Sequence, residues 1–330
     1  MKRKQPATGR LVRGILSTFS LCLCGTVPAG ADQGWEGQSF WVTWENDATR
    51  GSDRHYTQGA MLRYLSSDAA TPEWLKSFSH RIPDWGFESQ GWKFGLEVGQ
   101  QMYTPEDLDA VELVKDDQPY AGWFYWAMSL QRRGPTNTRH LPVMETLRVD
   151  LGMVGPISQA EHTQKVWHGR DPRGWHNQLG NEPGLALRYD RTYLLRVPLF
   201  DHFVLDGLPT TEWALGNVDI HLGIKATLRC GYNVPNEFEV PALKTRKKFG
   251  AYMFASLAGR AVAHSIFLDG NTWKESHRVE REPLVGYAVA GASLVLGPVE
   301  IIGSNNYVSH EFRGQRLSDS YGSVTILYKF

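Results

Sequence analysis

Apolar and polar residues alternate along most of the chain after residue 39. The clearest segment is 92–99, Trp-Lys-Phe-Gly-Leu-Glu-Val-Gly, in which every second side chain is apolar. The segment 146–153, Thr-Leu-Arg-Val-Asp-Leu-Gly-Met, alternates in the same way. Because successive side chains of a strand point to opposite faces, each segment predicts a strand with one apolar face and one polar or tightly packed face.

Similar segments of roughly 8–13 residues, separated by turn signals, predict about a dozen strands. The others begin near residues 39, 59, 120, 184, 211, 218, 250, 284 and 299, and the last ends at Phe330. An even number of strands is expected of a bacterial outer-membrane barrel. We therefore predict an all-β fold, a transmembrane antiparallel β-barrel of about 12 strands. Its interior would take the charged positions of these strands: Glu97, Arg148, Asp150 and Arg188.

Alternation is also expected of a soluble β-sandwich, which buries one face and hydrates the other. The distribution of aromatic residues favours the barrel, because membrane barrels carry aromatic girdles at both interfaces. The tryptophans that gather near predicted strand ends are Trp35, Trp41, Trp44, Trp92, Trp123 and Trp126. The final strand has aromatics at Tyr328 and Phe330 and stops there, which resembles the terminal signal of bacterial outer-membrane barrels.

Composition excludes several other classes of protein. The 35 basic residues are balanced by 35 acidic ones, so the chain lacks the positive excess of a nucleic-acid binder. Hydrophobic residues make up 42% of the chain, which excludes disorder. A mean hydropathy of −0.37, with no apolar run near 20 residues beyond the N-terminal region, excludes a helical membrane protein.

The first 31 residues have the organisation of a secretory signal. Five basic residues precede an apolar stretch at 15–27, which is followed by Ala29-Gly30-Ala31, a small-x-small cleavage site. A lipoprotein signal is the alternative, but Cys22 and Cys24 each follow leucine where lipidation requires a small residue. We expect 1–31 to be removed and 32–330 to form a single barrel domain. Cys230 is then the one cysteine left, so no intramolecular disulfide is expected.

The first predicted hairpin carries candidate metal chemistry. Glu45-Asn46-Asp47 ends its first strand, and the second strand begins within Asp53-Arg54-His55-Tyr56-Thr57. The hairpin is expected to bring Asn46, Asp47 and Thr57 together. Adjacent oxygen-bearing side chains suit a hard cation such as Ca²⁺. The alternative is an ordinary strand-ending turn, which Asn and Asp often form.

A helix is predicted between two strands after Pro156. Ser158 and Glu161 match a capping box for a helix that runs to about Gly169. Gln164 and His168 are four residues apart and share a face of it with Glu161, so His168 is a candidate base; an exposed, inert histidine is the alternative. No Gly-x-Ser-x-Gly, His-Glu-x-x-His or Walker motif is present, which favours an activated water as the nucleophile of any hydrolase.

Taken together, the polar motifs resemble the outer-membrane lipid A 3′-O-deacylase family from about Ser39 to Phe330. The motifs that carry the resemblance are Glu45-Asn46-Asp47, Asp53-Arg54-x-Tyr56-Thr57-x-Gly59, Gly99-Gln100-x-Met102-Tyr103-Thr104-Pro105, Asp117-x-Pro119-Tyr120-Ala121-Gly122, Gly155-Pro156 with His168, and Gly174-Trp175-x-Asn177-Gln178-Leu179-x-Asn181-Glu182-Pro183. Family members are twelve-stranded barrels that use Ca²⁺ to remove the 3′-linked acyloxyacyl chain of lipid A in the outer leaflet.

The resemblance implies roles for individual residues. It places Asn46 and Asp47 at the metal and oxyanion site with Thr57 beside them, and makes His168 the base that activates water, with Gln164 lining the same site. Asp171 is the stand-in for the carboxylate that orients the histidine, with Glu182 and Glu161 as alternatives. The stretch 106–112, where family members can be basic, is acidic here.

The expected partner is lipid A or lipopolysaccharide in the outer leaflet of the bacterial outer membrane, in which the chain is embedded; no nucleic acid is expected. The alternatives are an outer-membrane phospholipase, a narrow non-enzymatic barrel or porin, and a soluble periplasmic β-protein.

Overall fold

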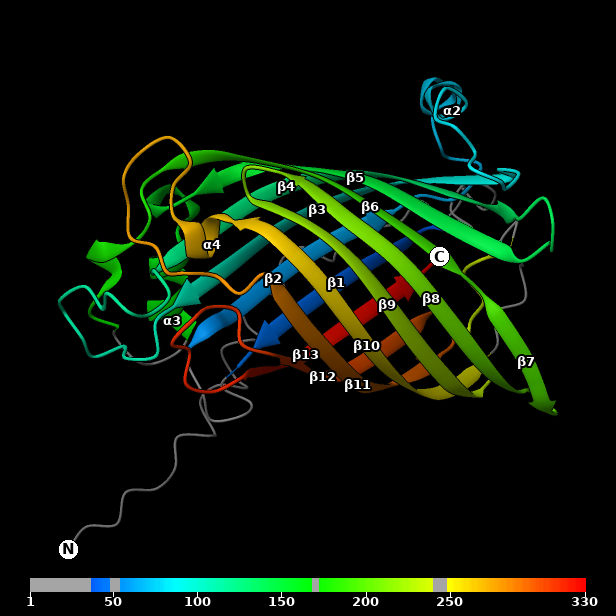
Figure 1. Cartoon of the computed structure of the whole chain (residues 1–330). Coiled ribbons are helices and arrows are strands. Elements are labelled where there is room, and N and C mark those ends of the chain that lie inside the picture. Colours follow the sequence, from blue (N-terminus) through cyan, green and yellow to red (C-terminus); the bar gives the residue numbers. More distant parts are fainter. Residues whose placement is uncertain (1–36, 48–53, 168–171, 240–247) are drawn as a thin grey trace, which may run out of the picture. The chain divides into compact units, whose positions relative to one another are not determined.

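The computed structural model describes residues 37–47, 54–167, 172–239 and 248–330 (Figure 1). The predicted signal segment 1–31 lies outside them. The strands are β1 (Ser39–Asn46), β2 (His55–Leu65), β3 (Gly91–Thr104), β4 (Ala121–Pro135), β5 (Pro142–Val154), β6 (Glu182–Tyr193), β7 (Leu195–Phe200), β8 (Phe203–Gly216), β9 (Asp219–Tyr232), β10 (Phe249–Ser265), β11 (Leu284–Leu296), β12 (Val299–Val308) and β13 (Asp319–Lys329). The helices are α2 (Glu73–Ser79), α3 (Ala160–Trp167) and α4 (Ile266–Asp269), with short 3₁₀ turns η2 (Pro156–Ser158) and η3 (Trp175–Asn177).

The strands close into an antiparallel barrel. Strands that follow each other in sequence pair with one another, except β6 and β7, and β1 pairs with β13 from Ser39–Lys329 to Asn46–Gly322. The remaining seam is closed by β6, which pairs directly with β8. The short β7 continues from β6 after Leu194 and pairs with the first residues of β8. The result is a twelve-stranded barrel with one extra strand, so the predicted fold is confirmed.

The outer face of the barrel is apolar and exposed, as alternation in the strands predicts. Its exposed side chains include Leu62, Leu96, Trp126, Leu151, Leu222, Ile224, Met253, Leu257 and Leu284. Burying such a surface in water-free hydrocarbon is favourable at about 25 cal/mol per Å². No helix among the described residues is long and apolar enough to cross a membrane.

The inner face carries the predicted charges in a paired network. Arg148 donates to Glu97 at 2.8 Å and also to Asp150. Arg188 donates to Asp150 at 2.7 Å and to Asp219 at 2.8 Å. Pairing of this kind offsets the cost of keeping charges away from bulk water.

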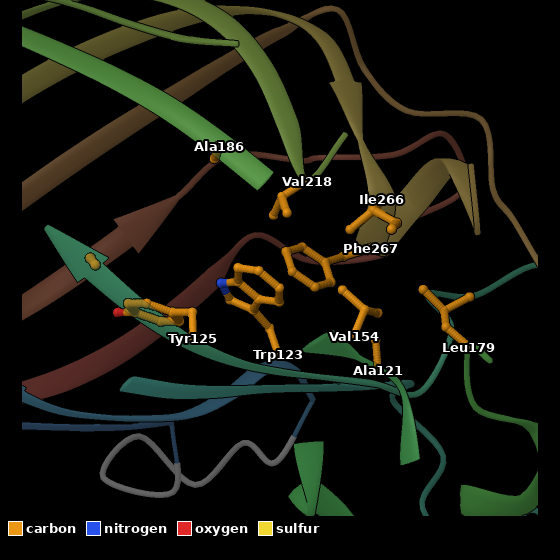
Figure 2. Close-up of a cluster of buried hydrophobic side chains, with 10 residues drawn as sticks. Ala121, Trp123, Tyr125, Val154, Leu179, Ala186, Val218, Ile266 and Phe267 are labelled. Atoms are coloured by element: carbon orange, nitrogen blue, oxygen red, sulfur yellow. The ribbon is translucent and has the colours of Figure 1, made fainter. Parts of the chain in front are cut away.

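An apolar cluster, here called the plug, lies inside the barrel near the end that carries α3 and α4, here called the loop rim (Figure 1). Phe267 of α4 stacks on Tyr103 with ring centroids 4.0 Å apart, and it packs with Trp123 and Val218 in one buried cluster (Figure 2). Trp123, expected from sequence in an interfacial girdle, instead points into the barrel and is 1% exposed. A cavity of about 250 Å³ is lined by these rings and by charged residues of the inner network.

The plug and the paired charges predict that the protein does not conduct ions. We expect single-channel recordings in planar bilayers to show no sustained open state, with or without Ca²⁺, because twelve strands leave little lumen once side chains fill it. A stable ohmic conductance would contradict this prediction and favour the narrow-pore alternative.

Candidate active site

The first hairpin brings Asn46, Asp47 and Thr57 together through one carbonyl. Asn46 Nδ2 donates to the Thr57 carbonyl oxygen at 3.4 Å, and the Asp47 N–H donates to the same oxygen at 3.3 Å. The pairing of β2 with β3 shifts register between Tyr56 and Gln58, so Thr57 is the extra residue of a β-bulge. Bulges bend a strand and re-aim its groups, which explains how a local defect assembles this cluster.

The cluster lies on the outer wall of the barrel. Glu45 points inward, where it accepts a hydrogen bond from the Tyr56 hydroxyl. Because successive side chains of a strand alternate between faces, Asn46 points outward. Thr57 Oγ1 lies 2.8 Å from Oγ1 of Thr104, whose neighbour Tyr103 lines the inner cavity. Outward positions of a barrel are normally exposed, yet Asn46 is 4% exposed. The next residue, Asp47, is 2% exposed and is bonded through its N–H to the same Thr57 carbonyl. Polar groups are therefore held under cover on the membrane-facing side.

Asp47 is held in place by the start of β2. Its Oδ2 accepts the Arg54 N–H at 2.6 Å, and Arg54 Nε donates to Asp319 Oδ1 at 3.3 Å. His55 lies between two carboxylates, with Nδ1 2.7 Å from Asp319 and Nε2 3.1 Å from Asp117. Three loops of the loop rim are thus joined beside Asp47.

The charge state of Asp117 follows from the hydrogen bonds that its carboxylate accepts. Burial alone would raise the pKa of Asp117, but His55 and the main-chain N–H groups of Glu106 and Gln118 hydrogen-bond to the carboxylate and hold its pKa below the usual value. Asp117 therefore stays ionised. Sequence reasoning missed His55 and Asp319 as partners, because they are 264 positions apart and neither lies in a recognisable metal or catalytic spacing.

The helix α3 covers the outer wall next to this cluster. Gln100 of β3 donates to the Ser158 carbonyl at 2.6 Å, and α3 packs on β3 and β4. Gly122 of β4 permits the approach: a Cβ there would lie 2.4 Å from Cβ of Ala160. The small residue is thus required where the helix crosses the strand.

Gln164 lies on the inner face of α3 and is 0% exposed. Its Oε1 accepts the indole N–H of Trp175 at 2.7 Å. Trp175 belongs to a buried cluster with Met102, whose strand partner is Gln58, and Gln58 in turn pairs with Asn46. These contacts connect Gln164 to the hairpin cluster across β1, β2 and β3. Asn46, Asp47, Thr57 and Gln164 are together called the outer-wall site.

The predicted capping box is wrong, although the helix itself is present. Ser158 lies in η2 and its hydroxyl donates to the Gly155 carbonyl at 2.6 Å, while Glu161 pairs with Lys165 at 2.8 Å. The helix begins at Ala160, after Gln159 in a left-handed conformation. Tertiary packing against β4, through Ser158 and Ala160, decides the start of the helix here.

His168 and Asp171 lie outside the described residues, so their assignments stay predictions. The two alternative carboxylates have other partners. Glu182 accepts the Asn271 side-chain amide at 2.9 Å and the Thr272 N–H at 2.9 Å, which ties down the loop after α4. Glu161 forms its ion pair on the solvent side of α3.

A hard cation fits the described part of the site by donor chemistry. Asp47 and Asn46 supply carboxylate and amide oxygens, the ligand types that Ca²⁺ takes. Among the described residues, no group of three or more His, Cys, Asp or Glu side chains is arranged to hold a metal ion. A site at Asp47 would thus draw on amide, main-chain or water oxygens besides this carboxylate.

Comparison with known proteins places this architecture in a family. A family model described as "Outer membrane protein LpxR" matches residues 17–330. LpxR from Salmonella typhimurium has the same fold, with a TM-score of 0.69 and 20% identity over 88% of this chain and 100% of that chain. The β domain of the Bordetella autotransporter BrkA gives a TM-score of 0.46 at 9% identity, over 90% of this chain and 99% of that one. No curated protein sequence matches significantly. The chain belongs to the LpxR family of outer-membrane proteins, the lipid A deacylase family that its motifs resemble.

Proposed function

We propose that the protein is a Ca²⁺-dependent lipid A 3′-O-deacylase, a carboxylic ester hydrolase that cleaves the 3′-acyloxyacyl ester in the outer leaflet. The observation that carries the proposal is the position of the outer-wall site. Asn46 and Gln164 are buried polar groups on the outer side of the wall, and Asp47 and Thr57 are buried beside Asn46. A soluble enzyme cannot reach an ester of lipid A in the membrane, whereas a site on the barrel wall lies beside it.

The chain's own residues have separate tasks in the proposed reaction. His168, four residues after Gln164 in the sequence, would take a proton from water, with Asp171 as its orienting carboxylate. Asn46 and Asp47 would hold Ca²⁺, which when bound polarises an ester carbonyl and stabilises negative charge on its oxygen. Thr57 fixes the geometry of the hairpin through its carbonyl, which accepts hydrogen bonds from Asn46 Nδ2 and from the Asp47 N–H. Gln164 offers an amide at the same wall.

Mass spectrometry of lipid A tests the proposal. We expect lipid A from cells that express the gene to lose the 3′-linked acyloxyacyl chain in Ca²⁺ and to keep it in chelator, because Asp47 is the one described carboxylate at the outer-wall site. Cells without the gene are the control. Unchanged lipid A in Ca²⁺ would contradict the proposal.

The purified protein should also be given phospholipids and lipid A in parallel. Release of fatty acid from phospholipids alone would replace the proposal by the phospholipase alternative.

A further inference from the structure

The amide of Gln164 has only one orientation compatible with its neighbour. The indole N–H of Trp175 can donate but cannot accept, so the group that faces it, at 2.7 Å, must be the Gln164 carbonyl oxygen. The NH₂ end is consequently turned away from Trp175. Among the described residues, Gln164 Nε2 is buried and has no hydrogen-bond partner.

An unsatisfied donor of this kind is costly in a folded protein. Leaving a buried N–H group without an acceptor costs about 1–3 kcal/mol, so native structures retain few of them. Gln164 is fully buried on the helical face that packs on the barrel wall. A buried donor at the edge of a polar site is suited to a substrate oxygen that arrives only on binding.

Trp175 is itself rigidly held. It is 1% exposed and packs with Met102, Leu108 and Ala160 in one cluster. Its ring lies against Tyr120 with centroids 4.9 Å apart. The preceding Gly174 allows this contact, because a Cβ there would lie 2.6 Å from the Tyr120 ring. The indole N–H therefore points in a fixed direction.

We infer that Trp175 is a positioning residue, which fixes the Gln164 amide so that its NH₂ group donates to the ester oxygen of the bound substrate as negative charge develops there. The inference rests on the proposed function. Trp175 does not touch the substrate; it acts by preventing the amide from turning its acceptor toward that oxygen. A donor held in advance stabilises the transition state more than one that must first rotate.

A double-mutant cycle in kcat tests the inference. Trp175→Phe keeps an aromatic ring but removes the N–H, and we expect kcat to fall about tenfold with KM within twofold of wild type. Gln164→Met removes the donor at similar size, and we expect kcat to fall about 10²–10³-fold. In the Gln164→Met background, Trp175→Phe should cause no further loss, because no amide remains to be oriented. Trp126→Phe, on the exposed outer face of β4, is the matched control and should leave kcat unchanged.

Each result decides one part of the inference. Full activity of Trp175→Phe, or a loss of equal size in the Gln164→Met background, overturns the positioning role. Heat-modifiable migration on gels confirms that each variant is folded.

The hydrogen bond between Trp175 and Gln164 is tested without an activity measurement, by hydrogen exchange of the Trp175 indole N–H. The signal of this N–H is identified by its absence in Trp175→Phe. Slow exchange that becomes fast in Gln164→Met supports the contact, and fast exchange in the wild type overturns it. A wild type that has the contact but never deacylates lipid A refutes the proposed function, and with it the catalytic part of the inference.

Discussion

Replacement of Asp47 by alanine is expected to lower the rate of lipid A deacylation by about 10²–10³-fold, the typical cost of losing one element that stabilises an oxyanion. Asp47 is 2% exposed and its Oδ2 is held by the Arg54 N–H at 2.6 Å. The carboxylate is thus held in place beside Asn46. Loss of the acyloxyacyl chain, measured by mass spectrometry of lipid A in cells, gives the rate.

Two further variants make the Asp47 result specific. Asp47→Asn keeps the size and the contact to Arg54 but removes the charge, so it should also lose activity and require more Ca²⁺ for what remains. Asp116→Ala removes an exposed carboxylate of a loop-rim segment and should behave as wild type. Wild-type activity in Asp47→Ala, with normal folding, would remove Asp47 from the mechanism.

Replacement of His168 by alanine is expected to have the other large effect, a fall of about 10²–10⁴-fold in kcat, since a positioned general base contributes that much. The wild-type rate should rise with pH as the imidazole loses its proton, because only the neutral ring can accept a proton from water. That rise should be missing from the residual activity of His168→Ala. A pH profile of kcat on purified lipid A measures both effects.

His162 of α3 provides the control. It is exposed on α3, six residues before His168, and His162→Ala should leave the rate and the pH profile unchanged. Equal losses in the two variants would indicate that α3 has been disturbed. Retained activity in His168→Ala alone would contradict its role as the base.

Much of the fold follows from the sequence because barrel strands encode their faces locally. Each strand alternates regardless of its distant partners, so the sequence predicts opposite faces for Leu96 and Glu97, and the structure has Leu96 exposed and Glu97 buried. The contact of Asn46 and Asp47 with Thr57 was predictable for a similar reason. The three belong to one hairpin, whose ends must meet.

Contacts between segments far apart in the sequence could not be predicted from local alternation. His55 meets Asp117 and Asp319 only because the barrel brings three loops to one side of the rim. Phe267 fills the interior beside Trp123, although nothing in its local sequence distinguishes it from a lipid-facing aromatic. The start of α3 differs from the predicted one because packing against Gly122 outweighs a capping motif.

The outward orientation of Asn46 sets how the proposed substrate would arrive. A lipid can drift to such a wall sideways, within its own monolayer, and leave by the same route with its remaining chains still immersed. Turnover would then respond to the mole fraction of substrate in that monolayer and not to its amount per volume of suspension. Added inert amphiphile should slow the reaction at constant total lipid A, simply by spreading the molecules apart in two dimensions.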